Sequence, residues 1–190
     1  HINWQCAQSD QFAALSTLEN RLEAVARPGI RVARLGGRLP AESLDRRWTS
    51  AKLKQVSWIE LPMQSAAPPS VSVRLGGIAE CDVLLVEGAL PYWSQDLQAE
   101  LIDHDARPAH LLLDSLTLTD ATPFFTLHKV DARIAPYRVD NAQHLIAQLS
   151  DLGYRLKKRW RNKEIHIDVP LTNCRAELSH GMHFQYSGTG

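Results

Sequence analysis

Apolar residues recur at helical spacing in several parts of the chain. Residues 141–152 place Leu145, Ile146 and Leu149 on one face, and Gly153 follows as a helix stop. A second helix is predicted over residues 9–26, where the apolar positions are Phe12, Leu15, Leu18, Leu22 and Val25. Residues 41–53 and 94–105 are also predicted to be helical.

Short runs of β-branched and aliphatic residues lie between these helices. They predict strands at residues 30–35, 55–61, 71–75, 82–87 and 110–114. The run Asp82-Val-Leu-Leu-Val-Glu87 is almost continuously aliphatic, which is typical of a strand buried on both faces. The alternation of strands with helices favours an α/β fold with a mostly parallel, doubly wound sheet.

In the last third of the chain, strands no longer alternate regularly with helices. Residues 124–130 predict a strand, Pro136 and Tyr137 a turn, and residues 155–169 and 182–186 two further strands. Two late strands after a helix indicate an antiparallel C-terminal edge on the sheet. We therefore expect one domain over residues 1–190, with an N-terminal helix (1–29), a cofactor-type half (30–120) and a C-terminal half (121–190).

Composition narrows the classes of function. The 190 residues hold 21 basic and 21 acidic side chains, so the formal net charge is zero and no nucleic-acid or anionic-membrane partner is expected. Three widely spaced cysteines favour a reduced, cytoplasmic protein over a disulfide framework. The basic segment 155–163 is expected to be a solvated face, with an acidic partner or a polyanion as the alternative.

Candidate site residues follow the predicted strands. The pair Gly36-Gly37 ends the first strand, Glu60 ends the second, and Glu87-Gly88 end the central one. In doubly wound folds, ligands bind outside the carboxyl ends of the strands, with glycines at the first turn and an acid after the second strand. This order predicts a nucleotide-like cofactor site. A nicotinamide-dependent dehydrogenase is a weaker alternative, because G-x-G-x-x-G spacing is missing.

Several ordered segments resemble a group of bacterial class I S-adenosylmethionine-dependent methyltransferases, which have a Rossmann-like fold. The segments that carry the resemblance are Arg34-Leu-Gly-Gly37, Trp58-Ile-Glu-Leu-Pro62, Asp82-Val-Leu-Leu-Val-Glu-Gly-Ala-Leu-Pro-Tyr-Trp93, His110-Leu-Leu-Leu-Asp-Ser-Leu-Thr-Leu-Thr119, Phe125-Thr-Leu-His128, Pro136-Tyr-Arg-Val139, Leu152-Gly-Tyr154 and Ile165-His-Ile-Asp-Val-Pro170. The resemblance covers most of residues 15–186.

The resemblance implies S-adenosylmethionine as cofactor and a small molecule or saccharide as methyl acceptor. It implies that Gly36 and Gly37 approach the methionine part of the cofactor and that Glu60 binds the ribose hydroxyls. Glu87, Gly88 and Tyr92 would line the adenine and the reaction cleft. The candidates for catalysis or acceptor contact are Tyr92, His128 and Tyr137.

Arg34 departs from the family pattern, which has an acid before the paired glycines. A lone guanidinium near a sulfonium would cost about 1–4 kcal/mol of binding free energy. Arg34 can instead turn outward, or pair with Glu60 or Glu87. Pro40 replaces a further turn glycine, and the segment before the first strand is shorter than the family pattern implies. The alternative is therefore a degenerate methyltransferase fold that acts as a binding or assembly subunit, with a protein partner or as a homodimer.

Histidines near the end of the chain offer a weak metal pattern. His180 and His183 have His-x-x-His spacing and lie near Cys174, but no second compact pair of ligands accompanies them. Two surface histidines explain the spacing better, so no metal site is expected.

Overall fold

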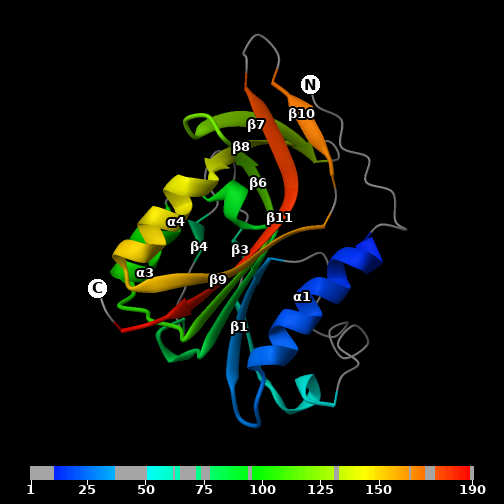
Figure 1. The fold of residues 1–190 in the computed structure, drawn as a ribbon. Helices are drawn as coiled ribbons and strands as arrows, with labels where there is room; N and C mark the ends of the chain where they lie inside the picture. Colours follow the sequence, from blue (N-terminus) through cyan, green and yellow to red (C-terminus); the bar gives the residue numbers. More distant parts are fainter. Residues whose placement is uncertain are drawn as a thin grey trace.

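A nine-stranded mixed sheet forms the centre of the protein, which we describe from a computed structural model (Figure 1). The structure describes residues 11–36, 51–61, 63–64, 72–73, 78–93, 96–130, 133–162, 164–169 and 174–188. The main strand order is β10-β11-β6-β5-β1-β2, and β9 pairs with β11 while β8 pairs with β6 and β7.

The central strands are parallel, as the alternation of strands and helices predicts. They are β1 (Arg31–Gly36), β2 (Ser57–Leu61), β5 (Val83–Glu87) and β6 (His110–Thr119). β11 (Arg175–Tyr186) runs antiparallel to β6, β9 (Tyr154–Arg161) and β10 (His166–Asp168). The predicted doubly wound, mostly parallel sheet with an antiparallel C-terminal edge is thus confirmed.

Helices cover both faces of the sheet (Figure 1). α1 (Gln11–Val25) lies on one face, while α3 (Leu97–Asp103) and α4 (Ala142–Asp151) lie on the other. Side chains of β1 point to both faces, because Val32 belongs to the apolar cluster that includes Leu18 of α1, whereas Leu35 belongs to the cluster that includes Leu101 of α3. Each central strand is therefore buried on both sides, which explains its continuous aliphatic sequence.

A β-hairpin and two short 3-10 turns flank the strands of the sheet. The hairpin of β7 (Phe124–Val130) and β8 (Arg133–Asn141) joins the sheet where Asp140 and Asn141 pair with the end of β6. The 3-10 turn η5 (Leu90–Tyr92) follows β5, and η3 (Leu53–Gln55) precedes β2. Asn141 caps α4 by accepting a hydrogen bond from the backbone N–H of His144 at 2.9 Å.

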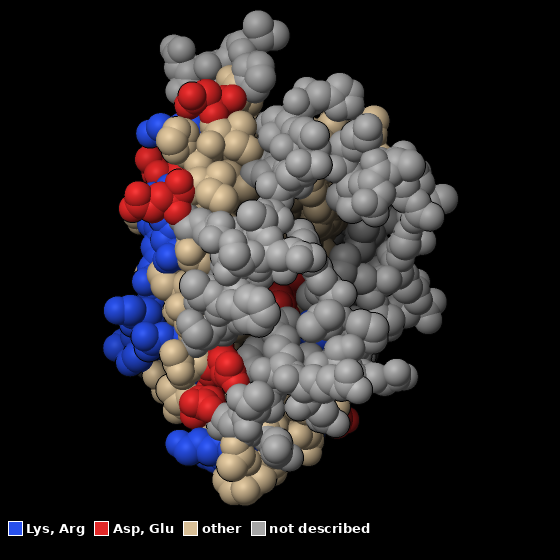
Figure 2. All heavy atoms as spheres, turned by 90° about the vertical axis from the view of Figure 1, so that its right-hand side faces the viewer, with Lys and Arg blue, Asp and Glu red and all other residues tan. Residues whose placement is uncertain are grey.

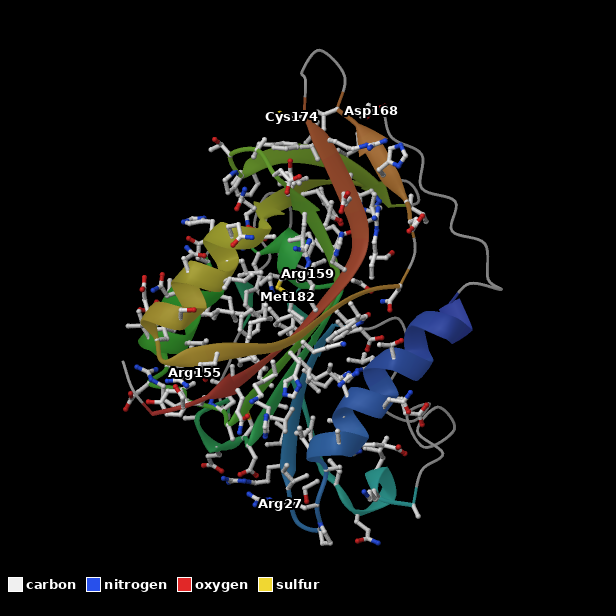
Figure 3. All side chains as sticks on the ribbon, viewed as in Figure 1. Arg27, Arg155, Arg159, Asp168, Cys174 and Met182 are labelled. Atoms are coloured by element: carbon white, nitrogen blue, oxygen red, sulfur yellow. The ribbon has the colours of Figure 1, made fainter. Side chains whose placement is uncertain are left out.

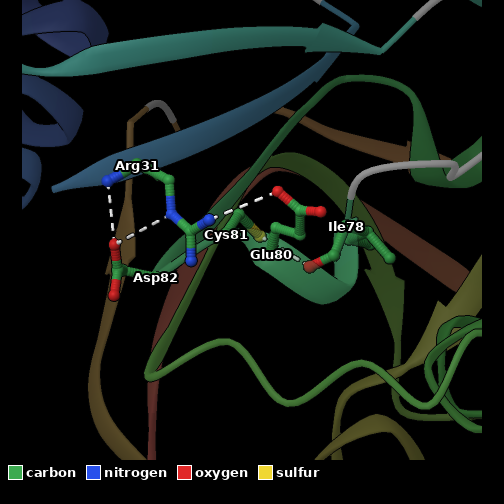
Figure 4. Close-up of polar contacts among 5 residues, drawn as sticks. All are labelled: Arg31, Ile78, Glu80, Cys81 and Asp82. Atoms are coloured by element: carbon green, nitrogen blue, oxygen red, sulfur yellow. Dashed lines mark hydrogen bonds and ion pairs between the residues drawn. The ribbon is translucent and has the colours of Figure 1, made fainter.

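An ion-pair cluster joins the amino ends of β1 and β5 (Figure 4). Arg31 donates from its backbone N–H to Asp82 at 2.8 Å, and its guanidinium lies 3.3 Å from Glu80 of η4 (Ile78–Glu80). The Cys81 thiol donates to the carbonyl oxygen of Ile78 at 3.1 Å. Burial raises the pKa of Cys81 to about 11, so this cysteine is an unreactive structural thiol at neutral pH.

Some predicted boundaries are wrong. Pro136 and Tyr137 lie inside β8 and do not form a turn; proline is tolerated because this hairpin strand pairs with β6 at only its last two residues. Residues 155–169 form two strands, β9 and β10, and the last strand starts at Arg175. Register shifts near His180 and Gly181 interrupt the alternation of that strand, which hid its length.

Two other predicted elements differ in part from the observed ones. The strand expected at residues 71–75 appears as β4 (Ser72–Val73), which pairs with β3 (Met63–Gln64) in a separate two-stranded sheet. Most of the helix expected over residues 41–53 lies outside the described residues, which resume at residue 51. No helix in the described part of the chain is long and apolar enough to cross a membrane.

Candidate cofactor crevice and aromatic cluster

The strand order creates a switch point between β1 and β5. The chain passes from β1 to its neighbour β2 on one side and then returns to β5 on the other side of β1. In open α/β sheets, a crevice forms outside the carboxyl ends of the strands at such a point, and ligands bind there. The register pairs Gly36 with Glu87 and Glu87 with Asp114, so β1 and β5 end side by side, next to Asp114 in the middle of β6.

Two glycines shape the strand ends. Gly36 has φ +83°, and a Cβ added to it would stand 2.3 Å from the Glu87 carbonyl oxygen and 2.9 Å from Cβ of Ala89. The turn after β1 therefore contacts the turn after β5 in a way that only glycine allows. Gly88 has φ +65°, and its N–H donates to the Asp114 carbonyl oxygen at 3.0 Å.

Two predicted cofactor residues, Gly37 and Glu60, lie wholly or partly outside the described residues. Gly37 lies outside the described residues. The Glu60 backbone pairs in register with Arg34 on β2, which places it on the strand next to β1, but its side chain lies outside the described part of the structure. Their roles stay predictions.

Arg34 is fully buried and pairs with Glu87. Its Nη2 lies 3.2 Å and its Nε 3.4 Å from Oε2 of Glu87, whose side chain is 11% exposed. Of the alternatives open from the sequence, the structure thus selects pairing with Glu87 over an outward orientation. Because the carboxylate offsets the guanidinium charge, the repulsion expected from a lone arginine does not arise in full.

Asp114 is a crevice residue that sequence reasoning did not single out. Its buried carboxylate accepts hydrogen bonds from the Ser115 hydroxyl at 3.0 Å, the Trp160 indole N–H at 3.2 Å and the Asn162 amide at 3.1 Å. Burial and, to a lesser degree, the neighbouring Glu87 raise the pKa of Asp114. The signal was present, since Asp114 ends an aliphatic run as Glu87 does.

Glycine also makes room for the Trp160 ring. A Cβ on Gly181 of β11 would stand 2.0 Å from the indole, so the ring of Trp160 covers the backbone of the neighbouring strand. The indole also packs against the apolar cluster beneath α1. Trp160 thus links β9 and β11 to Asp114 of β6.

The three candidate catalytic residues lie together. The Tyr92 hydroxyl is 2.6 Å from Nδ1 of His128, and the two rings stack with centroids 5.9 Å apart. The Tyr137 ring meets Tyr92 edge-on at 5.2 Å and His128 at 5.0 Å. Residues far apart in sequence therefore form one aromatic cluster, which we define as Tyr92, His128 and Tyr137.

Local geometry explains how the aromatic cluster forms. Tyr92 ends η5, directly after the turn at Glu87 and Gly88. The hairpin register pairs Thr126 with Tyr137 and His128 with Ala135, so His128 and Tyr137 are diagonal neighbours on one face. The Tyr137 hydroxyl is 2.6 Å from Oγ1 of Thr117 on β6, and burial raises the pKa of Tyr137.

A second ion-pair network fixes the hairpin against the start of α3. Nη1 of Arg138 lies 2.7 Å from Asp96, and its Nε lies 3.0 Å from Asp140 on the same strand. Gln148 of α4 also donates to Asp96 at 3.2 Å. This network adjoins Tyr137 in sequence and holds β8 in place.

The predicted surface position of the late histidines is wrong. His180 is 4% exposed and His183 is 8% exposed, because β11 is an internal strand with β6 on one side and β9 on the other. His180 pairs with Glu177 at 3.0 Å, and His183 contacts His110. Among the described residues, no group of three or more His, Cys, Asp or Glu side chains is placed to hold a metal ion.

Comparisons with known proteins find similar folds only among solved structures. No family model matches the chain, and no curated protein matches it. A Burkholderia thailandensis 1,6-didemethyltoxoflavin-N1-methyltransferase, solved with bound 1,6-didemethyltoxoflavin and S-adenosylhomocysteine, is 14% identical with a TM-score of 0.48, and the match covers 97% of this chain and 93% of that one.

Two further structures are similar at the same level. Magnesium protoporphyrin IX methyltransferase from Synechocystis, with bound S-adenosylhomocysteine, is 12% identical, covers 98% of this chain and 90% of its own, and has a TM-score of 0.45. The CcbJ methyltransferase from Streptomyces caelestis is 10% identical, covers 98% of this chain and all of its own (100%), and has a TM-score of 0.46. The fold class stated above rests on the strand order of this chain itself.

Proposed function

We propose that this protein is an S-adenosylmethionine-dependent methyltransferase that acts on a small molecule or saccharide. The observation that carries the proposal is the hydrogen bond between Tyr92 and His128, 2.6 Å long, directly after the turn that ends β5 at the switch point. In the proposal, the short segment from Glu87 to Tyr92 joins the site for a nucleotide-like cofactor to a pair of proton-handling side chains. The sequence resemblance to class I methyltransferases supplies the cofactor class.

The crevice residues fit a cofactor with a positive sulfonium. Arg34 and Glu87 offset each other, and Asp114 adds a second carboxyl group beside Glu87. Arg34 therefore does not present an uncompensated positive charge to the strand ends. In the proposal, the backbone at Gly36 and Gly37 binds the methionine part, and Glu60 binds the ribose hydroxyls.

The cofactor would supply an electrophilic methyl group, and the protein would position the acceptor in line with it. Tyr92 and Tyr137 offer aromatic surfaces on which a planar or saccharide acceptor can stack. In the tautomer with its proton on Nε2, His128 accepts a hydrogen bond at Nδ1 from the Tyr92 hydroxyl. This pair can take a proton from an acceptor hydroxyl or amine that must lose one.

A second candidate function follows from the Arg34–Glu87 pair. A carboxylate that is held by a buried guanidinium has less capacity to bind a ligand hydroxyl. A methyltransferase fold that has exchanged cofactor binding for a structural ion pair would serve as a binding or assembly subunit. This protein would then be expected to use a protein partner or a second copy, and we retain a cytoplasmic location as part of both proposals.

Two glycine-to-alanine variants that should introduce similar backbone strain test cofactor binding. Gly88 and Gly188 have similar left-handed conformations, with φ +65° and +71°, but only Gly88 lies at the crevice. We expect S-adenosylhomocysteine to raise the melting temperature of the wild type and of Gly188→Ala, and to raise that of Gly88→Ala much less. Equal shifts in both variants would place the ligand elsewhere, and no shift in the wild type would favour the binding-subunit function.

A further inference from the structure

A cluster that consists of a pair of histidines with basic side chains nearby lies on the α1 face of the sheet, towards the amino end of β6. His110 of β6 and His183 of β11 form its centre, with Nδ1 of His110 3.1 Å from Nε2 of His183 and ring centroids 5.2 Å apart. Along β6, His110, Leu112 and Asp114 alternate on this face, so Leu112 separates the pair from the crevice.

Three basic side chains act electrostatically on the histidine pair. Arg21 of α1 acts electrostatically on His183, Arg27, two residues after α1, acts on His110, and Lys157 of β9 acts on both. Within the part of the chain that the structure describes, the charged groups that act on either histidine are therefore all basic. Burial first, and then these cations, lower the pKa of His110 and lower that of His183 to about 4.

Arg21 gives an independent sign of an unsatisfied site. Its Nε is buried and has no hydrogen-bond partner among the described residues. A buried guanidinium N–H without an acceptor is costly, and such groups are nearly always paired in folded proteins. Lys157, by contrast, is exposed and available to a ligand from solvent.

The surface around the cluster is rich in basic residues. Lys and Arg side chains gather along the left edge of Figure 2, the side that faces the viewer in Figure 1. Figure 3 shows Arg27 below α1, and Arg155 and Arg159 along β9. The other exposed basic residues of β9 are Lys157, Lys158 and Arg161.

We propose that Arg21, His110, Lys157 and His183 form a binding site for a phosphate group, separate from the cofactor crevice. A phosphate oxygen would accept the free Nε–H of Arg21, and the dianion would attract protons to the histidine pair. The neutral net charge of the chain shows that this basic cluster is local and not part of a general basic surface. The phosphate can come from the free ion or from a phosphorylated metabolite.

NMR of the histidine imidazole signals can detect phosphate binding through a change in the pKa of His183. The apparent pKa of His183, assigned with the variant His183→Gln, is followed at constant ionic strength while sodium chloride is exchanged for inorganic phosphate. A parallel titration uses glycerol 1-phosphate. Phosphate is expected to raise the pKa by about one unit, a tenfold change in proton affinity. A stronger effect of the ester than of the free ion identifies a phosphorylated metabolite as the ligand, and the reverse identifies the free ion.

Matched arginine variants show whether the effect is local. Arg21→Met should abolish the phosphate-dependent shift, whereas Arg155→Met, an exposed β9 residue outside the cluster, should keep it. If Arg21→Met does not fold, Lys157→Met replaces it and should reduce the shift. A shift that is absent in the wild type, or equal in all variants, overturns the proposal and leaves the methyltransferase proposal untouched.

Discussion

Arg34 and Glu87 form a buried ion pair between the carboxyl ends of β1 and β5, with 3.2 Å between Nη2 and Oε2. The pair stands where the resemblance to methyltransferases implies an acid and a free cofactor-binding carboxylate. Arg34 is therefore a structural partner of Glu87 and not a lone positive charge in the crevice.

Removing Arg34 should destabilise the protein strongly. Arg34→Met leaves the Glu87 carboxylate, 11% exposed, without its buried partner, and we expect the free energy of unfolding to fall by about 3–5 kcal/mol. Arg34→Met with Glu87→Gln should cost less than the two single changes together. Urea unfolding of the wild type, Arg34→Met, Glu87→Gln and the double variant gives the interaction energy between the two side chains. A loss below about 1 kcal/mol for Arg34→Met would contradict the role of the pair.

Reversion of Arg34 to aspartate is a poor test of cofactor binding. The new aspartate would stand beside Glu87 and near Asp114, so three carboxyl groups would lie on three neighbouring strands. We expect Arg34→Asp to unfold at lower urea concentration than Arg34→Met, because like charges repel in a buried site. Equal midpoints would show that the side chain at position 34 can leave the crevice.

The close approach at Gly36 should also be measurable. Gly36→Ala meets the Glu87 carbonyl oxygen, whereas Gly29→Ala has a similar φ of +77° with nothing within 4 Å of the added Cβ. Gly29→Ala should cost about 1 kcal/mol of stability from backbone strain alone. Gly36→Ala should cost clearly more, and equal losses in urea unfolding would show that the two turns do not touch.

The hydrogen bond between Tyr137 and Thr117 should couple the hairpin to β6. Tyr137→Phe removes a buried hydroxyl whose partner lies 2.6 Å away, and we expect a loss of about 1–2 kcal/mol in unfolding free energy. Thr117→Val should cost a similar amount, but the double variant should cost less than the sum. Strict additivity in the double-mutant cycle would mean that the two hydroxyls do not interact.

Acid should destabilise the protein partly through His183. Its pKa is about 4 when folded, against 6.5 as the ordinary value, so the unfolded chain binds the proton more tightly. The contribution of this group to stability is complete above pH 6.5 and is lost as the pH falls towards 4. His183→Gln should flatten this part of the pH profile of unfolding, while the exposed His166→Gln should leave it unchanged. An unchanged profile in His183→Gln would contradict the burial of this residue.

The mostly parallel sheet was predictable because strands buried on both faces have a local sequence pattern. The aliphatic run from Val83 to Val86 specifies a strand buried on both sides, whatever its neighbours are. The start of β11 was harder to predict, because Gly181 looks like a turn residue in sequence. It is required inside a strand only because the Trp160 ring from β9 lies against it.

The aromatic cluster was predictable residue by residue, but its geometry was not. Tyr92, His128 and Tyr137 each follow from short motifs, whereas their contact depends on the hairpin register and on η5. Asp114 ends an aliphatic run and could have been singled out, but its contacts and those of the His110–His183 pair were not predictable for the same reason. Each depends on neighbours from β9 or β11, far along the chain, and no local spacing encodes such contacts.

The central proposal is most directly tested by isothermal titration calorimetry of the wild-type protein with S-adenosylmethionine. The methyltransferase proposal predicts saturable heat at one site per chain, with S-adenosylhomocysteine competing for the same site. The absence of heat at millimolar ligand, together with an unchanged melting temperature, would contradict it.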